Sequence, residues 1–522
     1  MSSEKRVIIA SILSAVILVA YGQIVGKVSP RGGGPLTSQQ NLANKPDADK
    51  KVMSVGPSEE TISLQSSYLS LEVGKESGSV HEIVVKKFLD LGGKNFVRFG
   101  GTYTVLAVGC SEDIAAKWRL KAISTGAGEW VCEKDGILTE LKISVNKGEP
   151  TFSIELTSSN KTEEVKSVPT RILGAWGHGD PEIGVQKSPI EVVLKSAERR
   201  SFQRSYLLFR DGQVKNVPRE IDMVTLSERF FCLSLNLQGE NKTKASIIAS
   251  PHGSVAVLVD QSRLISGKSS VTYSIPVYVG PRDFFHLREC GFEKALPLGF
   301  LGKIGLILML ILNWLASVTG SYGVGIIMLS MLVTLSLSPF TLISLRSMKK
   351  LQFLQPKIDS LRKKYEKDQA KLNKEMFALF KEHRVSPLGG CLPMLLPLPI
   401  FFALWSAISH VIELRGKSFL WIRDLTLPDR LATLPAGLTI NLLPILMIGT
   451  MVVQTKLSQR NMPRNDANRM FSGPLMSVIF GVMFYQVPAC LVLYWLANSL
   501  VTIAIYILSA RNADAEMRSG YA

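Results

Sequence analysis

Apolar runs long enough to cross a lipid bilayer constrain the fold of this 522-residue chain more than any other feature. A hydrocarbon core about 30 Å thick needs about 20 apolar helical residues, because each residue adds about 1.5 Å. One such run lies near the N-terminus and the others follow residue 321, whereas residues 27–296 contain none. The sequence therefore predicts a membrane protein with one large domain outside the bilayer. The six predicted spans are residues 1–26, 322–343, 389–412, 438–454, 472–487 and 489–510.

The N-terminal run, residues 7–25, follows two basic residues and has two interpretations. Ala20-Tyr21-Gly22 is similar to the small-residue site at which a signal peptide is cleaved. The run continues beyond that site, however, and Tyr21 stands near its end like an interfacial aromatic residue. We therefore expect an uncleaved anchor with its N-terminus in the cytoplasm.

Basic residues predict how the chain crosses the membrane, because positively charged loops stay in the cytoplasm. The segment 344–388 carries twelve Lys and Arg residues against five acidic ones, so we expect it inside. The apolar part of residues 300–320 is only about 15 residues long, and if it also spanned, the basic segment would be exported. We therefore expect residues 300–320, within an interfacial region at 291–321, to form an amphipathic helix in or near the outer interface. Both termini are then inside, with a short C-terminal tail at residues 511–522.

The part of the chain predicted to be exported contains two segments of different composition. Residues 27–59 are rich in Gly, Pro, Ser and Asn and predict a flexible linker. Residues 60–290 contain short alternating apolar runs with Gly, Asn and Lys between them, which predict a large antiparallel β-sandwich. A disulfide among its cysteines is allowed, but the sequence does not fix a pairing. Those cysteines are Cys110, Cys132, Cys232 and Cys290.

Enzyme motifs are missing from the predicted β-sandwich domain. Its histidines lie far apart without metal-ligand spacing, and no P-loop, nucleophile elbow or dinucleotide fingerprint is present. Asp180 and Glu182 near His178 are better explained by a solvated loop than by an acid–base cluster. We expect a binding or scaffolding module, no catalytic residues and no metal or cofactor.

The basic segment has helical periodicity over residues 351–384, with a predicted break at Pro356 and a turn at Asp368-Gln369. Two amphipathic helices in an antiparallel hairpin are expected. Its charge either fixes the topology and holds anionic lipid headgroups, or docks ribosomes and targeting factors. The candidate docking residues are Lys363, Lys364, Lys367 and Lys371.

The interiors of the last five spans contain neutral polar residues but no Lys, Arg, Asp or Glu. A transporter or pump usually carries ionisable groups there, so that class is disfavoured. Asn498 and Thr502 are four residues apart and share one helix face. Such residues either join helices by hydrogen bonds or together line a wet groove within the membrane.

Several motifs in this part of the chain resemble the YidC membrane protein insertase family across about residues 296–511. The layout is similar to that of the family in two-membrane bacteria: an anchor, a large periplasmic β-sandwich, an interfacial helix, and a five-helix core with a cytoplasmic hairpin. The motifs are Leu354-Gln-Pro-Lys-Ile358, Ser386-Pro-Leu-Gly-Gly-Cys-Leu-Pro393, Glu413-Leu-Arg415, Phe419-Leu-Trp-Ile-Arg-Asp-Leu425 and Leu491-Val-Leu-Tyr-Trp495.

The resemblance implies an insertase of the bacterial inner membrane that breaks no bonds and needs no cofactor. Nascent membrane proteins would enter a hydrophilic groove that is open to the cytoplasm and to lipid. The implied partners are these clients, phospholipids, the Sec translocon and its accessory subunits, and ribosomes or targeting factors at the hairpin. The groove residues, including two added from the polar pattern, are Ser330, Thr334, Trp495, Asn498 and Thr502, and the apolar exit face is Phe401, Met447 and Met483.

One position departs from the family's pattern. Many members carry an arginine five residues before a proline in the second span, and counting back from Pro339 gives Thr334 here. No Lys or Arg occupies the neighbouring turns. We therefore expect a groove that works by hydration and neutral hydrogen bonding rather than by a fixed positive charge.

Two other functions compete with the insertase. A membrane transporter with a periplasmic receptor domain is disfavoured by the uncharged spans and by the lack of an inverted-repeat texture. A tethered carbohydrate-modifying enzyme would suit a large β-sandwich but leaves the motifs of the helical core unexplained.

Overall fold

The computed structural model divides the chain into two compact units, one ending and the other beginning near residue 297, and we describe each by itself. The predicted anchor 1–26 and the linker, except for its last residue, lie outside the described residues. The structure describes residues 59–89, 96–100, 104–109, 118–176, 190–196, 202–206, 214–217, 220–237, 244–249, 255–296, 298, 300–365, 368–383, 398–408, 411–433, 439–459 and 477–519.

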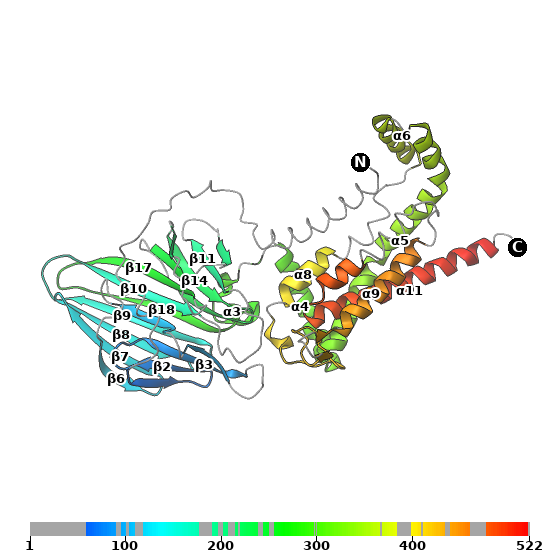
Figure 1. Ribbon diagram of the computed structural model, residues 1–522. Coiled ribbons are helices and arrows are strands. Elements are labelled where there is room, and N and C mark those ends of the chain that lie inside the picture. Colours follow the sequence, from blue (N-terminus) through cyan, green and yellow to red (C-terminus); the bar gives the residue numbers. More distant parts are fainter. Residues whose placement is uncertain are drawn as a thin grey trace. The chain divides into compact units, whose positions relative to one another are not determined.

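Within the described residues, the first unit is a sandwich of two nine-stranded antiparallel sheets (Figure 1). The first has the order β1 (Thr61–Gln65), β2 (Leu69–Gly74), β3 (Val80–Leu89), β5 (Leu106–Gly109), β10 (Lys166–Trp176), β17 (Val255–Ile265), β16 (Lys244–Ala249) and β13 (Val214–Val217), with β4 (Phe96–Gly100) beside β3. The second has the order β12 (Phe202–Tyr206), β11 (Glu191–Ser196), β14 (Ile221–Ser227), β15 (Phe231–Asn236), β18 (Ser270–Pro281), β9 (Thr151–Asn160), β8 (Ile137–Val145), β7 (Ala127–Lys134) and β6 (Arg119–Ser124).

Alternating side chains form the core between the sheets, because successive residues of a strand point to opposite faces. In β8 the buried positions include Leu141 and Ile143, while the intervening Lys142 pairs with Glu129 at 3.3 Å. The sheets approach closely at Gly174, where a Cβ would lie 3.1 Å from Leu235 Cδ1. The predicted antiparallel β-sandwich is confirmed.

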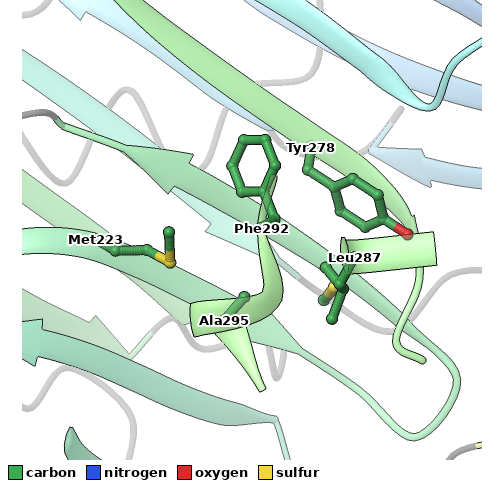
Figure 2. Packing of buried hydrophobic residues seen from close by; sticks show 6 residues of the cluster. Met223, Tyr278, Leu287, Phe292 and Ala295 are labelled. Carbon is green, nitrogen blue, oxygen red and sulfur yellow. The ribbon is translucent and has the colours of Figure 1, made fainter. Parts of the chain in front are cut away.

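The chain leaves the sandwich through two short helices that pack onto the second sheet. These are α3 (Phe284–Glu289), capped by the Asp283 carboxylate, and η1 (Glu293–Ala295). Figure 2 shows Phe292 and Leu287 in the buried cluster that also contains Met223 and Tyr278. This cluster fixes the chain to the sheet just before the second unit begins.

The sequence allowed a disulfide among four cysteines, and the structure shows the state of two of them. Cys232 and Cys290 are unpaired thiols, and burial raises the pKa of Cys232 to about 12 and that of Cys290 to about 11. Cys110 lies outside the described residues. Both thiols are therefore protonated at neutral pH and poor nucleophiles.

The second unit is helical, and its bounds differ from the predicted spans. It contains α4 (Phe300–Thr319), α5 (Tyr322–Lys364), α6 (Gln369–Glu382), α8 (Leu398–Ile408), η3 (Ile412–Leu414), the short strands β19 (Ala432–Thr433) and β20 (Thr439–Ile440), α9 (Leu442–Gln459), the helical residues 477–483, and α11 (Ala489–Ser519). Of the described helices, those at 300–319, 322–343 and 489–509 are long and apolar enough to cross a membrane, and 398–408 and 442–457 are shorter apolar helices.

The helix α4 in the predicted interfacial region nearly coincides with the predicted helix over residues 300–320. It has 20 residues, so by length and composition it could also span. It packs closely against α8, because a Cβ at Gly305 would clash with the Ala403 carbonyl oxygen. The opposite face, which includes Phe300, Ile307 and Trp314, is exposed.

The predicted helix break at Pro356 is wrong, because α5 continues through both Pro339 and Pro356. A proline removes one backbone hydrogen bond, but a long helix can tolerate this loss with local adjustment. The turn instead follows Lys364, and Asp368 caps α6 by accepting a 3.1 Å hydrogen bond from the Lys371 backbone N–H.

The helix α6 folds back along the end of α5. Leu354 and Ile358 of α5 are buried against Leu379 and Phe380 of α6. Near the end of α6, His383 Nε2 lies 3.2 Å from Lys357 Nζ. Residues early in this part of α5 thus meet residues late in α6, as in an antiparallel hairpin.

A carboxylate anchors the first described residue of the sandwich. Glu59 accepts hydrogen bonds from the backbone N–H of Glu76 (2.9 Å) and Ser77 (3.0 Å), from the Ser77 hydroxyl, and from His81 Nε2 (3.0 Å). Burial acts to raise the pKa of Glu59, but these bonds outweigh it and hold that pKa below its usual range. Gly74 leaves room for the carboxylate, since a Cβ there would clash with it.

The Glu59→Gln variant is expected to destabilise the sandwich at neutral pH but not in acid. A carboxyl whose pKa is lowered in the folded state stabilises that state above its unfolded pKa of about 4.3, and this contribution is lost as the pH falls through the folded pKa. Thermal unfolding of the full chain between pH 7 and pH 3 should therefore show two melting temperatures that converge in acid. A constant difference across this range would contradict the role of the ionised carboxylate.

Candidate functional site

A seam of buried polar side chains joins the apolar helices α5 and α11. Asn498 Nδ2 donates a 2.8 Å hydrogen bond to Thr334 Oγ1, across the two helices. Four residues earlier on each helix, Ser330 Oγ donates to the backbone oxygen of Tyr494 at 3.0 Å. Thr334 is 6% exposed and Asn498 is 9% exposed. In the interior of a membrane no water is available to these polar groups, so they must find hydrogen-bond partners within the protein.

The remaining hydroxyls of this polar seam are also engaged. Thr334 Oγ1 donates to the Ser330 carbonyl at 2.7 Å, and Thr502 Oγ1 donates to the Asn498 carbonyl at 2.8 Å. Threonine hydroxyls commonly make such bonds to the preceding turn of their own helix. The structure brings these predicted groove residues to the contact between α5 and α11, where they bind one another and the backbone. The four residues are Ser330, Thr334, Asn498 and Thr502.

Trp495, the fifth predicted groove residue, lies in an aromatic cluster beside the polar seam. Its ring meets Phe401 of α8 edge to face at 5.2 Å between centroids, and it stacks on Phe480 at 6.1 Å. Phe484 is 5.5 Å from Trp495 and 5.3 Å from Phe401. The cluster therefore ties α8 and residues 477–484 to α11. Edge-to-face and offset pairs of this kind each add about 0.5–1.5 kcal/mol beyond area burial.

The predicted apolar exit face does not form one exposed surface in this structure. Phe401 is 2% exposed and Met447 is 0% exposed, whereas Met483 is 43% exposed. Phe401 is buried because it sits at the centre of the aromatic cluster. The sequence contains the aromatic residues of this cluster, at positions 401, 405, 480, 484 and 495. Because they are far apart along the chain, no local pattern predicted that they meet.

Sequence reasoning also missed a buried phenol. Tyr494 precedes Asn498 by one helical turn, and its Oη is buried without a hydrogen-bond partner. An unsatisfied buried hydroxyl costs about 1–3 kcal/mol. The group is therefore available to a polar ligand or a water molecule, in contrast to the hydroxyls of the polar seam.

The predicted docking lysines lie around the turn between α5 and α6. Lys363 and Lys364 are exposed in the last turn of α5, and Lys371 lies in the first turn of α6 with its Nζ 3.6 Å from Asp368. Phe377 of α6 is exposed. Lys367 lies outside the described residues, as do His178, Asp180 and Glu182 of the rejected acid–base cluster.

Comparison with known proteins identifies relatives for most of the chain. The family model described as "60Kd inner membrane protein" matches residues 314–516. The "Membrane protein insertase YidC" of Geobacter metallireducens is 28% identical over 544 residues, which cover 96% of this chain and 97% of the relative. That of Pelobacter propionicus is 36% identical over 283 residues, which cover 53% of this chain and only about half, 52%, of the relative. That of Geobacter sp. M21 is 40% identical over 240 residues, 45% of this chain and 42% of the relative.

Two solved structures also resemble the chain. A structure titled "Active YidC insertase crystal structure with the first transmembrane domain resolved" matches with a TM-score of 0.37 and 19% identity over 87% of this chain and 93% of that chain. The structure of YidC from Thermotoga maritima matches with a TM-score of 0.29 and 16% identity over 87% and 99% of the two chains.

The bond between Asn498 and Thr334 should be measurable as a coupling energy. In a double-mutant cycle of Asn498→Ala and Thr334→Val, we expect a coupling of about 0.6–1.7 kcal/mol, as found for hydrogen bonds between membrane helices. Unfolding of the detergent-solubilised full chain gives the four free energies. Leu500→Ala, an exposed position on the same helix, is the control and should change stability by less than about 0.5 kcal/mol. Additive single variants would show that the two side chains do not interact.

Proposed function

The chain belongs to the YidC membrane protein insertase family, and on that premise we propose that it inserts nascent proteins into the inner membrane and helps them fold. The clients are hydrophobic segments with short polar flanks. They enter a groove bounded by α5, α11 and their neighbours, which opens to the cytoplasm and to lipid. No bond is broken and no cofactor takes part.

The observation that carries the proposal is the polar seam inside two apolar helices. Moving an unpaired polar group from water into an apolar medium costs several kcal/mol. A client amide or hydroxyl that reaches Thr334 or Asn498 can exchange hydrogen bonds with them, so part of its lost hydration is replaced. Because bonds are exchanged rather than only broken, the barrier falls without an external energy source. Burial of the client's own apolar surface, about 25 cal/mol per Å², supplies the driving force.

The exit from the groove passes along apolar side chains. Met483 and its neighbour Val482 are exposed at the surface of residues 477–483 and are the first candidates to contact a departing client. Phe401 contacts a client only after the aromatic cluster separates, and Met447 only after its own surroundings open, because both are buried in this structure. This proposal therefore includes an opening of the cluster around Trp495 during insertion.

The proposed topology places both termini and the α5–α6 hairpin in the cytoplasm and the β-sandwich in the periplasm. The charge of the hairpin supports this side, because basic loops remain inside. Lys363, Lys364 and Lys371 then face ribosomes, targeting factors or anionic headgroups. Cooperation with the Sec translocon and its accessory subunits belongs to the same proposal. The transporter alternative is not favoured, since the described spans place neutral rather than ionisable residues at the polar seam.

Site-specific photocrosslinking tests the function directly. A crosslinker at position 334 or 401 of the full chain should capture a stalled nascent two-span membrane protein. A crosslinker at Leu335 is the matched control, because this residue adjoins Thr334 on α5 but is exposed on another face. Capture that is equal from all three positions, or that is missing from position 334, would contradict insertion beside the polar seam.

The Thr334→Arg variant tests whether a neutral seam is sufficient. The larger, charged side chain would replace a 6% exposed threonine and remove the acceptor of Asn498, so we expect no gain in the insertion of clients with acidic flanks. Client insertion into vesicles, with Thr334→Ser as the control that keeps the hydroxyl, provides the measurement. A large gain for Thr334→Arg would show that the neutral seam limits insertion and would refute the hydration mechanism.

A further inference from the structure

The loop between α8 and α9 is far more buried than a connecting loop usually is. In residues 411–433 and 439–441, which we call the cap, the side chains of Leu414, Ile422 and Leu425 are almost inaccessible. Connecting loops normally run over a surface with their backbone groups in water. The burial of the cap therefore requires that its polar groups find partners in the protein.

Backbone groups of the cap satisfy the start of α11. This helix follows Pro488, and its first N–H groups have no partner within the helix. The N–H of Ala489 donates to the Leu427 carbonyl at 2.8 Å, and the N–H of Cys490 donates to the Leu425 carbonyl at 2.9 Å. Cys490 is completely buried at this contact.

The cap also holds the end of the helical segment 477–483. Asn441 Nδ2 donates a 2.6 Å hydrogen bond to the Tyr485 carbonyl, and the backbone N–H of Asn441 donates to Tyr485 Oη at 3.3 Å. The same hydroxyl donates to the Thr439 carbonyl. The ends of two helices, α11 and 477–483, are thus bound to one loop.

A single buried carboxylate attaches the cap to the third helix, α9. Asp429 is 5% exposed. Its Oδ2 accepts a 2.8 Å hydrogen bond from the Leu443 backbone N–H in the first turn of α9. The same oxygen accepts a 3.3 Å hydrogen bond from Nε1 of Trp421, which lies earlier in the sequence of the cap. A negative charge at a helix N-terminus is favoured by the helix dipole as well as by these donors.

The cap lies at the opposite end of α5 from the hairpin. A Cβ at Gly323, near the start of α5, would clash with the Phe419 ring of the cap. The hairpin contacts begin at Leu354, which is about 45 Å further along the helix axis at 1.5 Å per residue. If the hairpin is cytoplasmic, the cap therefore closes the helical unit on the exported side.

We propose that Asp429 is the positioning residue that holds the cap over the ends of α9, α11 and residues 477–483, and so keeps the client path closed to the exported side. This inference rests on the proposed function and its topology. It assigns the closure to one carboxylate that joins Trp421 and α9, rather than to general packing of the loop. Removing the acceptor leaves the buried Leu443 N–H and the partly buried Trp421 Nε1–H without this partner, which favours the state in which the cap has moved into water.

Native Cys490 reports whether the cap is closed. We would treat right-side-out and inside-out membrane vesicles containing the full chain with an impermeant maleimide, and measure label at Cys490 by peptide mass spectrometry. Asp429→Ala removes the acceptor, while Asp429→Asn keeps a side-chain oxygen in its place. Asp424→Ala is the matched control, because Asp424 accepts its hydrogen bonds from Thr426, two residues away within the same cap. Label at Cys232, buried in the sandwich, reports general unfolding.

We expect Asp429→Ala to raise the labelling rate of Cys490 in right-side-out vesicles at least about tenfold, which corresponds to a change of about 1.4 kcal/mol in the closing equilibrium. Asp429→Asn and Asp424→Ala should stay within about twofold of the unmodified chain, and Cys232 should be unaffected. Unchanged labelling of Asp429→Ala, equal labelling of the Asn and Ala variants, or a parallel rise at Cys232 would overturn the role of Asp429. None of these outcomes bears on whether the chain inserts clients. A rise confined to inside-out vesicles would instead overturn the exported position of the cap and the topology of the proposed function.

Discussion

Polar groups inside apolar helices must find partners within the protein, and this requirement organises the helical unit. At the polar seam, Asn498 and Thr334 satisfy one another across two helices, and Ser330 reaches the backbone of the second helix. At the cap, the same requirement is met by loop carbonyls and by Asp429, which accept hydrogen bonds from the N–H groups at helix starts that have no partner within their own helix. Both places hold neighbouring helices together through a few directional bonds rather than through the hydrophobic effect, which gives little preference for one helix contact over another in lipid.

The sequence predicted those parts of the fold that depend on periodicity and charge. Alternation in strands such as β8 was enough to predict the antiparallel sandwich, because one face of each sheet must be apolar. Helical spacing placed Asn498 and Thr502 on one helix face, and in the structure Thr502 bonds to the Asn498 carbonyl while Asn498 bonds to Thr334. Their role as groove residues stays a prediction. The resemblance to the YidC family was recognised from sequence motifs, and YidC relatives match the chain.

Other features depend on contacts that no local pattern reveals. Pro356 suggested a break, but α5 continues because a long helix tolerates one missing bond. Phe401 and Met447 were assigned to an open face, yet both are buried. The ring of Phe401 contacts that of Trp495, which lies 94 positions away in the chain. Asp429 drew attention only as one acidic residue in a loop of mixed charge, because its partners Trp421 and Leu443 lie on opposite sides of it in the sequence.

The continuity of α5 has a mechanical consequence. Its 43 residues form one continuous helix from the Phe419 contact, past Thr334 and Pro339, to the buried pair Leu354 and Ile358. A straight segment of hydrogen-bonded helix transmits displacement along its axis, and bending concentrates where a proline has removed a backbone bond. Pro339 lies only five residues beyond Thr334. A displacement of the hairpin would therefore bend α5 near Pro339. This point lies about one and a half helical turns from the hydrogen bond between Thr334 and Asn498.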